Sequence, residues 1–271
     1  MKKYLFTDLD RTLLFDQKDK TYDLNQEDLN ALRLAANYDI EIIAASGRAQ
    51  NAAQFLIRRI GYPIDMIALN GAEISCNGTN TLLTGLPLGD YVKISEDVNK
   101  KFAKVAIGTL DYDGTYYLKE PYCNEYIYRL TRHQLIGAEN PIRSDIELKN
   151  NREECQLPKI LFYVKKTEDP LFFLSYLKKT YGSVYHFLFS NDAIIECIPK
   201  EVNKAVGIQK YMKMRNIYSQ QCWAAGDSDN DIEMLKMFKN SCCMEHGTKL
   251  AKEAATYVVK NITEVIEKMI N

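Results

Sequence analysis

Two aspartates and a threonine stand at alternate positions near the start of the chain, directly after a short apolar run. The run covers residues 4–6, and Asp8, Asp10 and Thr12 follow it. Carboxylates this close together repel each other unless a cation lies between them, and an oxygen-rich site suits Mg²⁺. The alternative is a turn after an edge strand, in which Asp and Thr side chains cap the backbone. On this segment alone, the site and the turn are equally good interpretations.

Three further turns carry polar side chains of complementary chemistry. They contain Ser46 and Gly47 after an apolar run, Lys204 near a predicted helix start, and Asp227, Asn230 and Asp231 in one loop. Several carboxylates can hold one Mg²⁺, while a hydroxyl, an ammonium and backbone amides at a helix start can hold phosphoryl oxygens. Each turn alone is a weak indication, because a lone lysine is most often solvated and an acidic loop is often only a loop.

The segments around these turns alternate between short apolar runs and stretches in which apolar residues recur at the spacing of a helix. The predicted strands are 4–6, 40–45, 66–69, 221–225, 242–244 and 257–259, and the predicted helices begin at Asn25, 49, 201, 232, 250 and Asn261. Strands that alternate with helices predict a parallel sheet with right-handed crossovers. Ligands of such sheets bind beyond the carboxyl ends of the strands, which is where these polar turns are placed.

The pattern changes between about residue 77 and residue 198. Residues 104–112 and 115–119 flank Asp113–Gly114, a dipeptide that supplies the positive φ angles of a tight hairpin turn. Helices are predicted for 122–136 and 171–179, and strands for 158–164 and 184–189. We therefore expect an α/β fold with a Rossmann-like doubly wound parallel sheet as its core, formed by residues 1–77 and 199–271. Residues 78–198 form an inserted α+β domain.

The inserted segment is rich in tyrosine. Eleven of the 18 tyrosines lie there, at positions 91, 112, 116, 117, 122, 126, 128, 163, 176, 181 and 185. Tyrosine can line a polyol pocket, but most buried tyrosines belong to a core, and we weigh these two interpretations at roughly one to three.

Composition excludes several classes of function. Lys and Arg number 35 against 36 Asp and Glu, and the resulting formal net charge of −1 offers no attraction to nucleic acid or an anionic membrane. No apolar run approaches the roughly 18 residues of a spanning helix, and no signal peptide opens the chain. The seven cysteines and three histidines lack the spacings of disulfide frameworks or zinc sites. We expect a soluble, cytoplasmic protein without nucleic-acid or membrane partners.

Taken in order, the four polar turns resemble the motifs of the haloacid dehalogenase superfamily of phosphohydrolases. Residues 8–12, Asp-Leu-Asp-Arg-Thr, resemble its first motif, DxDxT, and Ser46-Gly47-Arg48 its second. Lys204 resembles the third, and residues 226–231, Gly-Asp-Ser-Asp-Asn-Asp, the fourth, GDxxND. The long insert is similar to that of the Cof-type subgroup, whose large α/β cap closes over the active site. The dipeptide Asn70-Gly71 fits the same subgroup.

Two segments depart from that subgroup. Where it has Met-x-Asn-Ala after the fourth motif, this chain has Met244 followed by Glu245-His246-Gly247-Thr248. The subgroup's Asp-Gly-Val near the C-terminus is also missing. Both departures concern the rim of the site, and therefore the substrate more than the chemistry.

The resemblance implies a role for each site residue. Asp8 would attack phosphorus, and Asp10 would protonate the leaving oxygen and then deprotonate the hydrolytic water. Mg²⁺ would be held by Asp8, Asp227 and Asp10, the last through its carbonyl. The phosphate-binding group would be Thr12, Ser46, Gly47, Lys204 and Asn230, with Thr12 also bracing the first motif and Asp231 supporting the metal ligands.

We therefore expect a Mg²⁺-dependent phosphatase of small phosphate esters, sugar phosphates first among them, working through an aspartyl-phosphate. Two other interpretations stay open: a phosphotransferase with a hydroxyl acceptor, and an idle protein that only binds a phosphorylated ligand. The presence of all four residues Asp8, Asp10, Lys204 and Asp227 argues against the idle protein. The acid at Asp10 argues against a dehalogenase, because halide leaves without a proton.

Overall fold

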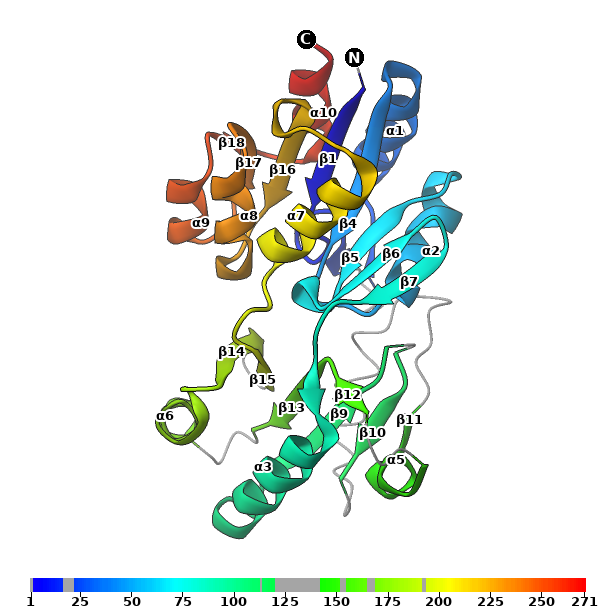
Figure 1. The fold of residues 1–271 in the computed structure, drawn as a ribbon. Helices are drawn as coiled ribbons and strands as arrows, with labels where there is room; N and C mark the ends of the chain where they lie inside the picture. Colours follow the sequence, from blue (N-terminus) through cyan, green and yellow to red (C-terminus); the bar gives the residue numbers. More distant parts are fainter. Residues whose placement is uncertain are drawn as a thin grey trace. The chain divides into compact units, whose positions relative to one another are not determined.

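The computed structural model describes residues 2–16, 22–112, 114–119, 142–151, 155–164, 169–191 and 194–271. These residues form two compact units (Figure 1). The first contains the described residues up to Leu83 and from Asn203 onward, and the second contains those from Thr84 to Val202. The sequence predicted boundaries at 77/78 and 198/199. The first boundary falls later because residues 79–82 form a strand that pairs in the sheet of the first unit.

The first unit is built on an eight-stranded sheet in the order β18-β17-β16-β1-β4-β5-β6-β7. Neighbouring pairs from β18 to β5 are parallel, and β6 and β7 add an antiparallel hairpin at one edge. The strands are β1 (Lys3–Thr7), β4 (Ile40–Ala45), β5 (Asp65–Ala68), β6 (Glu73–Cys76), β7 (Thr79–Leu82), β16 (Cys222–Gly226), β17 (Asn240–Met244) and β18 (Tyr257–Val259). The predicted parallel α/β core is confirmed.

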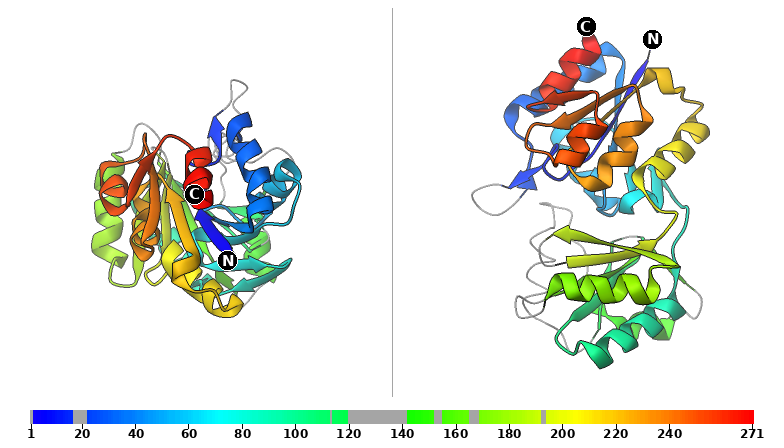
Figure 2. Two further views of the ribbon diagram at one scale, coloured as in Figure 1. Left: turned by 90° about the horizontal axis from the view of Figure 1, so that it is seen from above. Right: turned by 90° about the vertical axis from the view of Figure 1, so that its left-hand side faces the viewer.

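Helices cover both faces of this sheet (Figure 2). One set is α1 (Gln26–Ala35), α2 (Asn51–Ile60) and α10 (Ile262–Ile270), and the other is α7 (Lys204–Arg215), α8 (Ile232–Met237) and α9 (Lys249–Ala254). Short 3₁₀ turns lie between them: η1 (Ala36–Tyr38), η2 (Leu69–Gly71), η3 (Ser219–Gln221) and η4 (Asp229–Asp231). Because both faces are covered, the central strands are mostly apolar, and Leu5 and Phe6 of β1 are fully buried.

Side-chain caps fix where the helices begin. Asn25 accepts a hydrogen bond from the backbone N–H of Asp28, and Asn261 caps α10 in the same way, so both predicted helix starts are confirmed. The helix predicted from residue 201 begins at Lys204, because Asn203 is its cap and accepts from the N–H of Val206. This cap places Lys204 in the first turn of α7.

The second unit contains a six-stranded sheet in the order β11-β10-β9-β13-β15-β14. Its strands are β9 (Ala106–Leu110), β10 (Tyr116–Leu118), β11 (Ile142–Ser144), β13 (Lys159–Tyr163), β14 (Tyr185–Asn191) and β15 (Ile194–Pro199), and its helices are α3 (Leu88–Lys101), α5 (Asp145–Asn151) and α6 (Pro170–Tyr181). Apolar side chains of these helices and of the sheet form one core, for example Ile94, Phe173 and Phe162. The unit is α+β, as predicted.

The hairpin predicted in the second unit is present, because β9 and β10 pair antiparallel. Asp113 of its turn and the helix predicted for 122–136 lie outside the described residues. Two minor pairs complete the strands: β2 (Phe15–Asp16) with β3 (Tyr22–Asp23), and β8 (Leu86–Pro87) with β12 (Gln156–Leu157). Among the described helices, none combines the length and the apolar character needed to cross a bilayer.

Candidate active site

The polar turns predicted from the sequence meet at one edge of the first sheet. Asp8 follows β1, Ser46 follows β4 and Asp227 follows β16, and these three strands are neighbours in the order β16-β1-β4. The backbone N–H of Asp8 donates to the carbonyl of Ala225, which holds the ends of β1 and β16 together. Parallel strands present their carboxyl ends at the same edge, so residues far apart in the sequence share one site.

Three carboxylates form a buried cluster at this edge. Oxygens of Asp8, Asp227 and Asp231 all lie within 4.8 Å of one another. Their residues are 5%, 1% and 0% exposed, so water screens little of their mutual repulsion. This donor set of carboxylate oxygens is the chemistry that a hard divalent cation such as Mg²⁺ requires.

Lys204 is the cation of this cluster. Its Nζ lies 2.5 Å from Asp8 Oδ1 and 2.6 Å from Asp231 Oδ1, and the residue is 1% exposed. Burial alone lowers the pKa of Lys204, but the charges of Asp231 and Asp8, and the hydrogen bonds to them, raise its pKa above the usual range. The lysine is therefore held charged, and its one positive charge is shared between Asp8 and Asp231.

Burial and neighbouring negative charges raise the pKa values of two carboxyl groups in the cluster. Burial raises the pKa of Asp8 well above its usual range; Lys204 opposes this rise, and Asp231 and Asp10 add to it. Burial also raises the pKa of Asp227, against the hydrogen bond from Ser228. A further positive charge in the cluster would reverse both effects, because a nearby cation favours the ionised form.

At this edge of the sheet, two buried side-chain oxygens make no hydrogen bond to the residues that the structure describes. They are Thr12 Oγ1 and Asp227 Oδ2. The other oxygen of Asp227 accepts from the hydroxyl of Ser228 at 2.9 Å, while Oδ2 has only Arg11 Nη1 at 3.5 Å. Buried polar atoms are nearly always bonded. An oxygen-binding cation beside Asp227, and a polar ligand within reach of Thr12, would satisfy them, so these residues fit the predicted Mg²⁺ and phosphoryl group.

Asp231 has a larger part in the cluster than the sequence indicated. Its Oδ2 accepts from the backbone N–H groups of Asp227 and Ser228, each at 3.0 Å, while Oδ1 faces Lys204. The side chain also lies against Gly226, where a Cβ would come within 2.6 Å of the carboxyl carbon. Asp231 thus fixes the backbone of the fourth motif and orients the lysine, while its supporting role for the metal ligands stays a prediction.

The carboxylate of Asp10 is not part of the cluster. Arg48 binds it through two nitrogens, with Nε 2.9 Å from Oδ2 and Nη2 2.5 Å from Oδ1, and the aspartate side chain is 41% exposed. The guanidinium also lies over the ring of Tyr22, 4.9 Å from its centroid. A bidentate Arg–carboxylate pair is strong and directional. It therefore holds this carboxylate apart from Asp8, while the expected contact of the Asp10 carbonyl with metal stays a prediction.

The remaining predicted phosphate ligands border the cluster from β4 and η4. Ser46 is fully buried, and its hydroxyl accepts from the backbone N–H of Arg48 at 3.2 Å. The side chain of Asn70 lies between Gly47 and Asn230 and contacts both residues. From the sequence, Asn70 was known only as part of the dipeptide Asn70-Gly71. The spacing of residues along the chain does not indicate that the end of β5 lies beside η4.

The segment 245–248 braces the fourth motif. Thr248 donates its N–H to the carbonyl of Asp227 and its hydroxyl to Asp229, at 2.8 Å and 2.6 Å. His246 Nε2 lies 2.7 Å from the carbonyl of Arg11, and Gly247 leaves room for the Asp227 carbonyl, which a Cβ would approach to 2.7 Å. The residues that depart from the subgroup pattern therefore position the loop of the fourth motif. The sequence alone did not reveal this contact.

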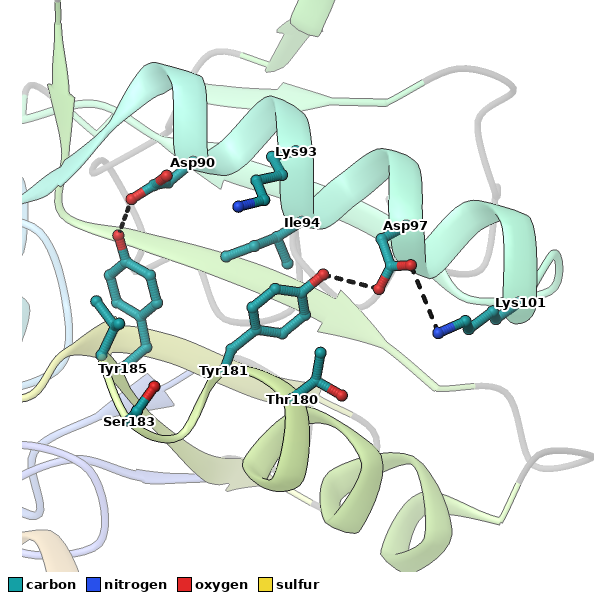
Figure 3. A pocket seen from close by; sticks show the side chains of 10 residues that line it. Asp90, Lys93, Ile94, Asp97, Lys101, Thr180, Tyr181, Ser183 and Tyr185 are labelled. Atoms are coloured by element: carbon teal, nitrogen blue, oxygen red, sulfur yellow. Dashed lines mark hydrogen bonds and ion pairs between the residues drawn. The ribbon is translucent and has the colours of Figure 1, made fainter.

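The second unit contains a cavity of about 510 Å³ between α3 and the end of α6 (Figure 3). Its acidic groups are already bonded: Tyr185 donates to Asp90, and Tyr181 donates to Asp97 at 2.7 Å. Lys101 Nζ lies 3.6 Å from the other oxygen of Asp97. The cavity therefore has neither the surplus charge nor the unpaired oxygens of the cluster around Asp8.

Comparison with known proteins defines the class. A family model described as haloacid dehalogenase-like hydrolase matches residues 5–269. The chain therefore belongs to the haloacid dehalogenase-like hydrolases, which confirms the family predicted from the four motifs. The 5-amino-6-(5-phospho-D-ribitylamino)uracil phosphatase YitU of Bacillus subtilis is 26% identical over 262 residues, covering 94% of this chain and 91% of that protein. With relatives of this kind, the predicted enzyme class, a phosphatase, is supported.

Solved structures agree with the fold. TM0651 from Thermotoga maritima superposes with a TM-score of 0.81 at 21% identity, covering 99% of this chain and 97% of that one. The subclass IIB sugar phosphatase BT4131 gives a TM-score of 0.78 at 19% identity, covering 100% of each chain. Both comparisons confirm the predicted α/β core with an inserted domain.

Proposed function

We propose that this protein is a Mg²⁺-dependent phosphatase of small phosphorylated metabolites, sugar phosphates in particular, and that it works through an aspartyl-phosphate on Asp8. The observation that carries this proposal is the buried cluster of three carboxylates, two of which share one lysine. Such a cluster carries surplus negative charge, which a divalent cation would offset when a phosphoryl group binds. Relatives named as phosphatases support the same reaction class.

Asp8, Asp227 and the carbonyl of Asp10 are the groups we assign to Mg²⁺. When bound, the ion would neutralise the carboxylates and the phosphoryl oxygens, which lets two anions meet. Asp8 attacks phosphorus in line with the leaving oxygen, and the P–O bond to the substrate breaks as the bond to Asp8 forms. Lys204 and Ser46 hold phosphoryl oxygens, and Asn230 and the backbone at Gly47 complete the cradle.

Asp10 is the proposed general acid and base. It protonates the leaving alkoxide in the first step and removes a proton from water in the second, when water attacks the phosphorus of the aspartyl-phosphate. Its carboxylate is paired with Arg48, so this role requires the pair to open when substrate binds. The proposal thus predicts a second position for the Asp10 side chain, closer to Asp8.

We further propose that the second unit, the predicted cap, selects the substrate. All residues assigned to phosphoryl transfer lie in the first unit. A cap that binds the non-reacting part of a substrate can use that binding to align the ester and exclude water. The substitution Tyr116→Ala on β10 should therefore reduce kcat/KM for a preferred metabolite more than for p-nitrophenyl phosphate. Equal losses on both substrates would place selectivity in the first unit.

The test of the function is a screen of phosphorylated metabolites with Mg²⁺, in which phosphate release is measured and ranked by kcat/KM. Asp8→Asn provides the matched blank, because an amide has the same shape and is no nucleophile. Adding an acceptor alcohol separates hydrolysis from phosphoryl transfer to a hydroxyl. Phosphate release that is equal in wild type and Asp8→Asn would overturn the proposal. The cytoplasmic location expected from the sequence stays a prediction.

A further inference from the structure

Asn70 lies where three of the polar turns come together. It is the central residue of η2, directly after β5, and it is 5% exposed. Its backbone N–H donates to the carbonyl of Ser46 at 2.9 Å. The turn thus connects the end of β5 to the end of β4, which carries the second motif.

The side chain of Asn70 reaches two other residues of the proposed phosphate cradle. A Cβ on Gly47 would lie 3.2 Å from both the oxygen and the nitrogen of its carboxamide, so the amide group covers the Cα of that glycine. Asn230 Nδ2 donates to Asn70 Oδ1 in a long hydrogen bond of 3.5 Å. The carboxamide therefore stands between β4 and η4 and sets the spacing between them.

The next residue connects this turn to α7. Gly71 has a φ of +100°, and a Cβ there would collide with the carbonyl oxygen of Asn203. From the other side, a Cβ on Gly207 would lie 2.8 Å from the Cα of Gly71. This close packing leaves no room for η2 to move without moving the first turn of α7, where Lys204 begins the helix.

We propose that Asn70 is a positioning residue for phosphate binding, which acts by fixing Asn230 and the backbone at Gly47. The inference rests on the proposed function, because it assigns these two residues to the phosphoryl group. Asn70 itself need not contact the substrate. Without its carboxamide, Asn230 loses a hydrogen-bond partner and the loop at Gly47 loses the group that covers it.

The backbone of Asn70 makes a clean substitution available. Its φ of +58° lies in the left-handed region, which asparagine tolerates and glycine adopts without strain. Asn70→Gly therefore removes the carboxamide and keeps the turn. Asn216 has a φ of +52° in an exposed position at the C-terminus of α7. Asn216→Gly therefore makes the same chemical change at the end of α7 that lies far from η2.

The first measurement uses the full chain with saturating Mg²⁺, p-nitrophenyl phosphate as substrate and inorganic phosphate as competing ligand. We expect Asn70→Gly to raise KM for the ester and Ki for phosphate by roughly five- to tenfold, the effect of one lost hydrogen bond. Asn216→Gly should leave both constants unchanged. The kcat of Asn70→Gly should fall by a smaller factor, because Asp8 and Lys204 are untouched.

The second measurement is a double-mutant cycle with Asn230→Ala. If Asn70 acts in part through Asn230, the double variant should lose less phosphate affinity than the product of the two single losses, and the loss beyond that of Asn230→Ala measures the effect through the backbone at Gly47. The side-chain NH₂ resonance of Asn230, assigned by its absence in Asn230→Ala, should shift in Asn70→Gly and stay in place in Asn216→Gly. This readout reports the contact whether or not the enzyme turns over.

Three outcomes would overturn the inference. Unchanged Ki for phosphate in Asn70→Gly would show that the contact has no part in binding. Losses that multiply in the double variant would show that Asn70 acts independently of Asn230. A wild-type protein that binds no inorganic phosphate would overturn the proposed function together with this inference, whereas the first two outcomes overturn the inference alone.

Discussion

Each unit of the molecule buries a lysine beside carboxylates, and the two arrangements differ in their balance of charge. In the second unit Lys159 Nζ lies 2.7 Å from Glu196 Oε1, with both side chains less than a tenth exposed. In the first unit Lys204 is shared by Asp8 and Asp231, with Asp227 in the same cluster. The Lys159–Glu196 pair is balanced in charge, whereas the cluster around Lys204 holds surplus negative charge. This surplus distinguishes a site that binds cations from a structural ion pair.

The largest effect is expected for the nucleophile. Asp8→Asn should lower turnover by about 10⁴-fold or more, because no other group can form the covalent intermediate. The same change removes one charge from the surplus, so the variant without Mg²⁺ should melt at a higher temperature than wild type. Phosphate release and thermal melting measure the two effects.

Glu196→Gln is the matched control in the balanced pair. It should lower the melting temperature, because Lys159 is left buried with an amide, and it should leave kcat nearly unchanged. If Asp8→Asn kept more than about one hundredth of wild-type turnover, or still formed an acid-stable acyl-phosphate, Asp8 would not be the nucleophile.

Bound Mg²⁺ should offset the surplus negative charge of the cluster around Lys204, which the Lys159–Glu196 pair does not have. Excess EDTA should abolish activity, and Mg²⁺ at about 100 times its Kd should stabilise the fold by about 2.7 kcal/mol. Ca²⁺ should compete for the site and support little turnover, because its looser coordination does not hold the in-line geometry. Full activity in EDTA, with residual metal excluded by elemental analysis, would contradict this prediction.

The dependence of stability on pH follows from the raised pKa values of Asp8 and Asp227. A carboxyl whose pKa is higher in the folded than in the unfolded state binds more protons when folded, so its contribution to stability is full below the unfolded pKa. That contribution is lost as pH rises through the folded pKa. Without metal, unfolding free energy should therefore decline from about pH 4 upward. Mg²⁺ should flatten the decline, and a metal-free profile that rises through this range would contradict the assignment.

Substitution of the two lysines compares the arrangements directly. Lys204→Met should lower kcat/KM by roughly 10² to 10³-fold, because a positive charge aimed at the phosphoryl group is lost. Lys159→Met should instead destabilise the fold by about 3 kcal/mol, the cost of one unpaired buried charge, with catalysis intact in the folded fraction. Denaturant titrations and steady-state kinetics separate the two.

The double variant Lys159→Met/Glu196→Leu tests whether the second pair is only structural. It should recover most of the stability lost in Lys159→Met, since apolar residues of similar volume often replace a buried pair without cost. If either variant lost catalysis as strongly as Lys204→Met, the balanced pair would belong to the active site.

The sequence was sufficient to predict that the residues around Lys204 come together, because Asp8, Ser46 and Asp227 follow neighbouring strands. Asp8, Ser46 and Asp227 each come directly after an apolar run, and the carboxyl ends of parallel strands share one edge. The caps at Asn25 and Asn261 were equally local. Features of this kind depend on spacing along the chain, and spacing can be read from the residues.

Other features could not be predicted because they depend on packing between distant segments. Arg48 reaches Asp10 with a long side chain that has many rotamers, so the sequence did not indicate that this carboxylate would be paired with it. Lys159 and Glu196 meet only because β13 and β15 pair in one particular register. Asn70 reaches Asn230 through a contact between residues 160 positions apart.

The smallest effect is expected in the cavity of the second unit. Asp97 accepts hydrogen bonds from Tyr181 and Tyr176, and Lys101 lies beside it, so its partners belong to α3 and α6 (Figure 3). The hydrogen bond from Tyr176 is the largest of the effects that lower the pKa of Asp97, opposed by partial burial. A carboxyl with a lowered pKa stabilises the fold above its unfolded pKa and loses this contribution as pH falls through the folded pKa.

Asp97→Asn should therefore cost about 1 kcal/mol or less at neutral pH, since the group is partly exposed and water screens its charge. The loss should shrink as pH falls below about 4, because Asp97 becomes protonated in the unfolded chain before it does in the folded protein, where its pKa is lowered. Urea titrations at pH 7 and pH 3.5 measure both values, with Lys93→Gln, on the same helix face, as a matched control for an exposed charge. Because this network is balanced like Lys159–Glu196, kcat/KM should not change. A tenfold loss of kcat/KM in Asp97→Asn, with the fold intact, would mean that a balanced cluster also serves catalysis and that surplus charge alone does not mark the site.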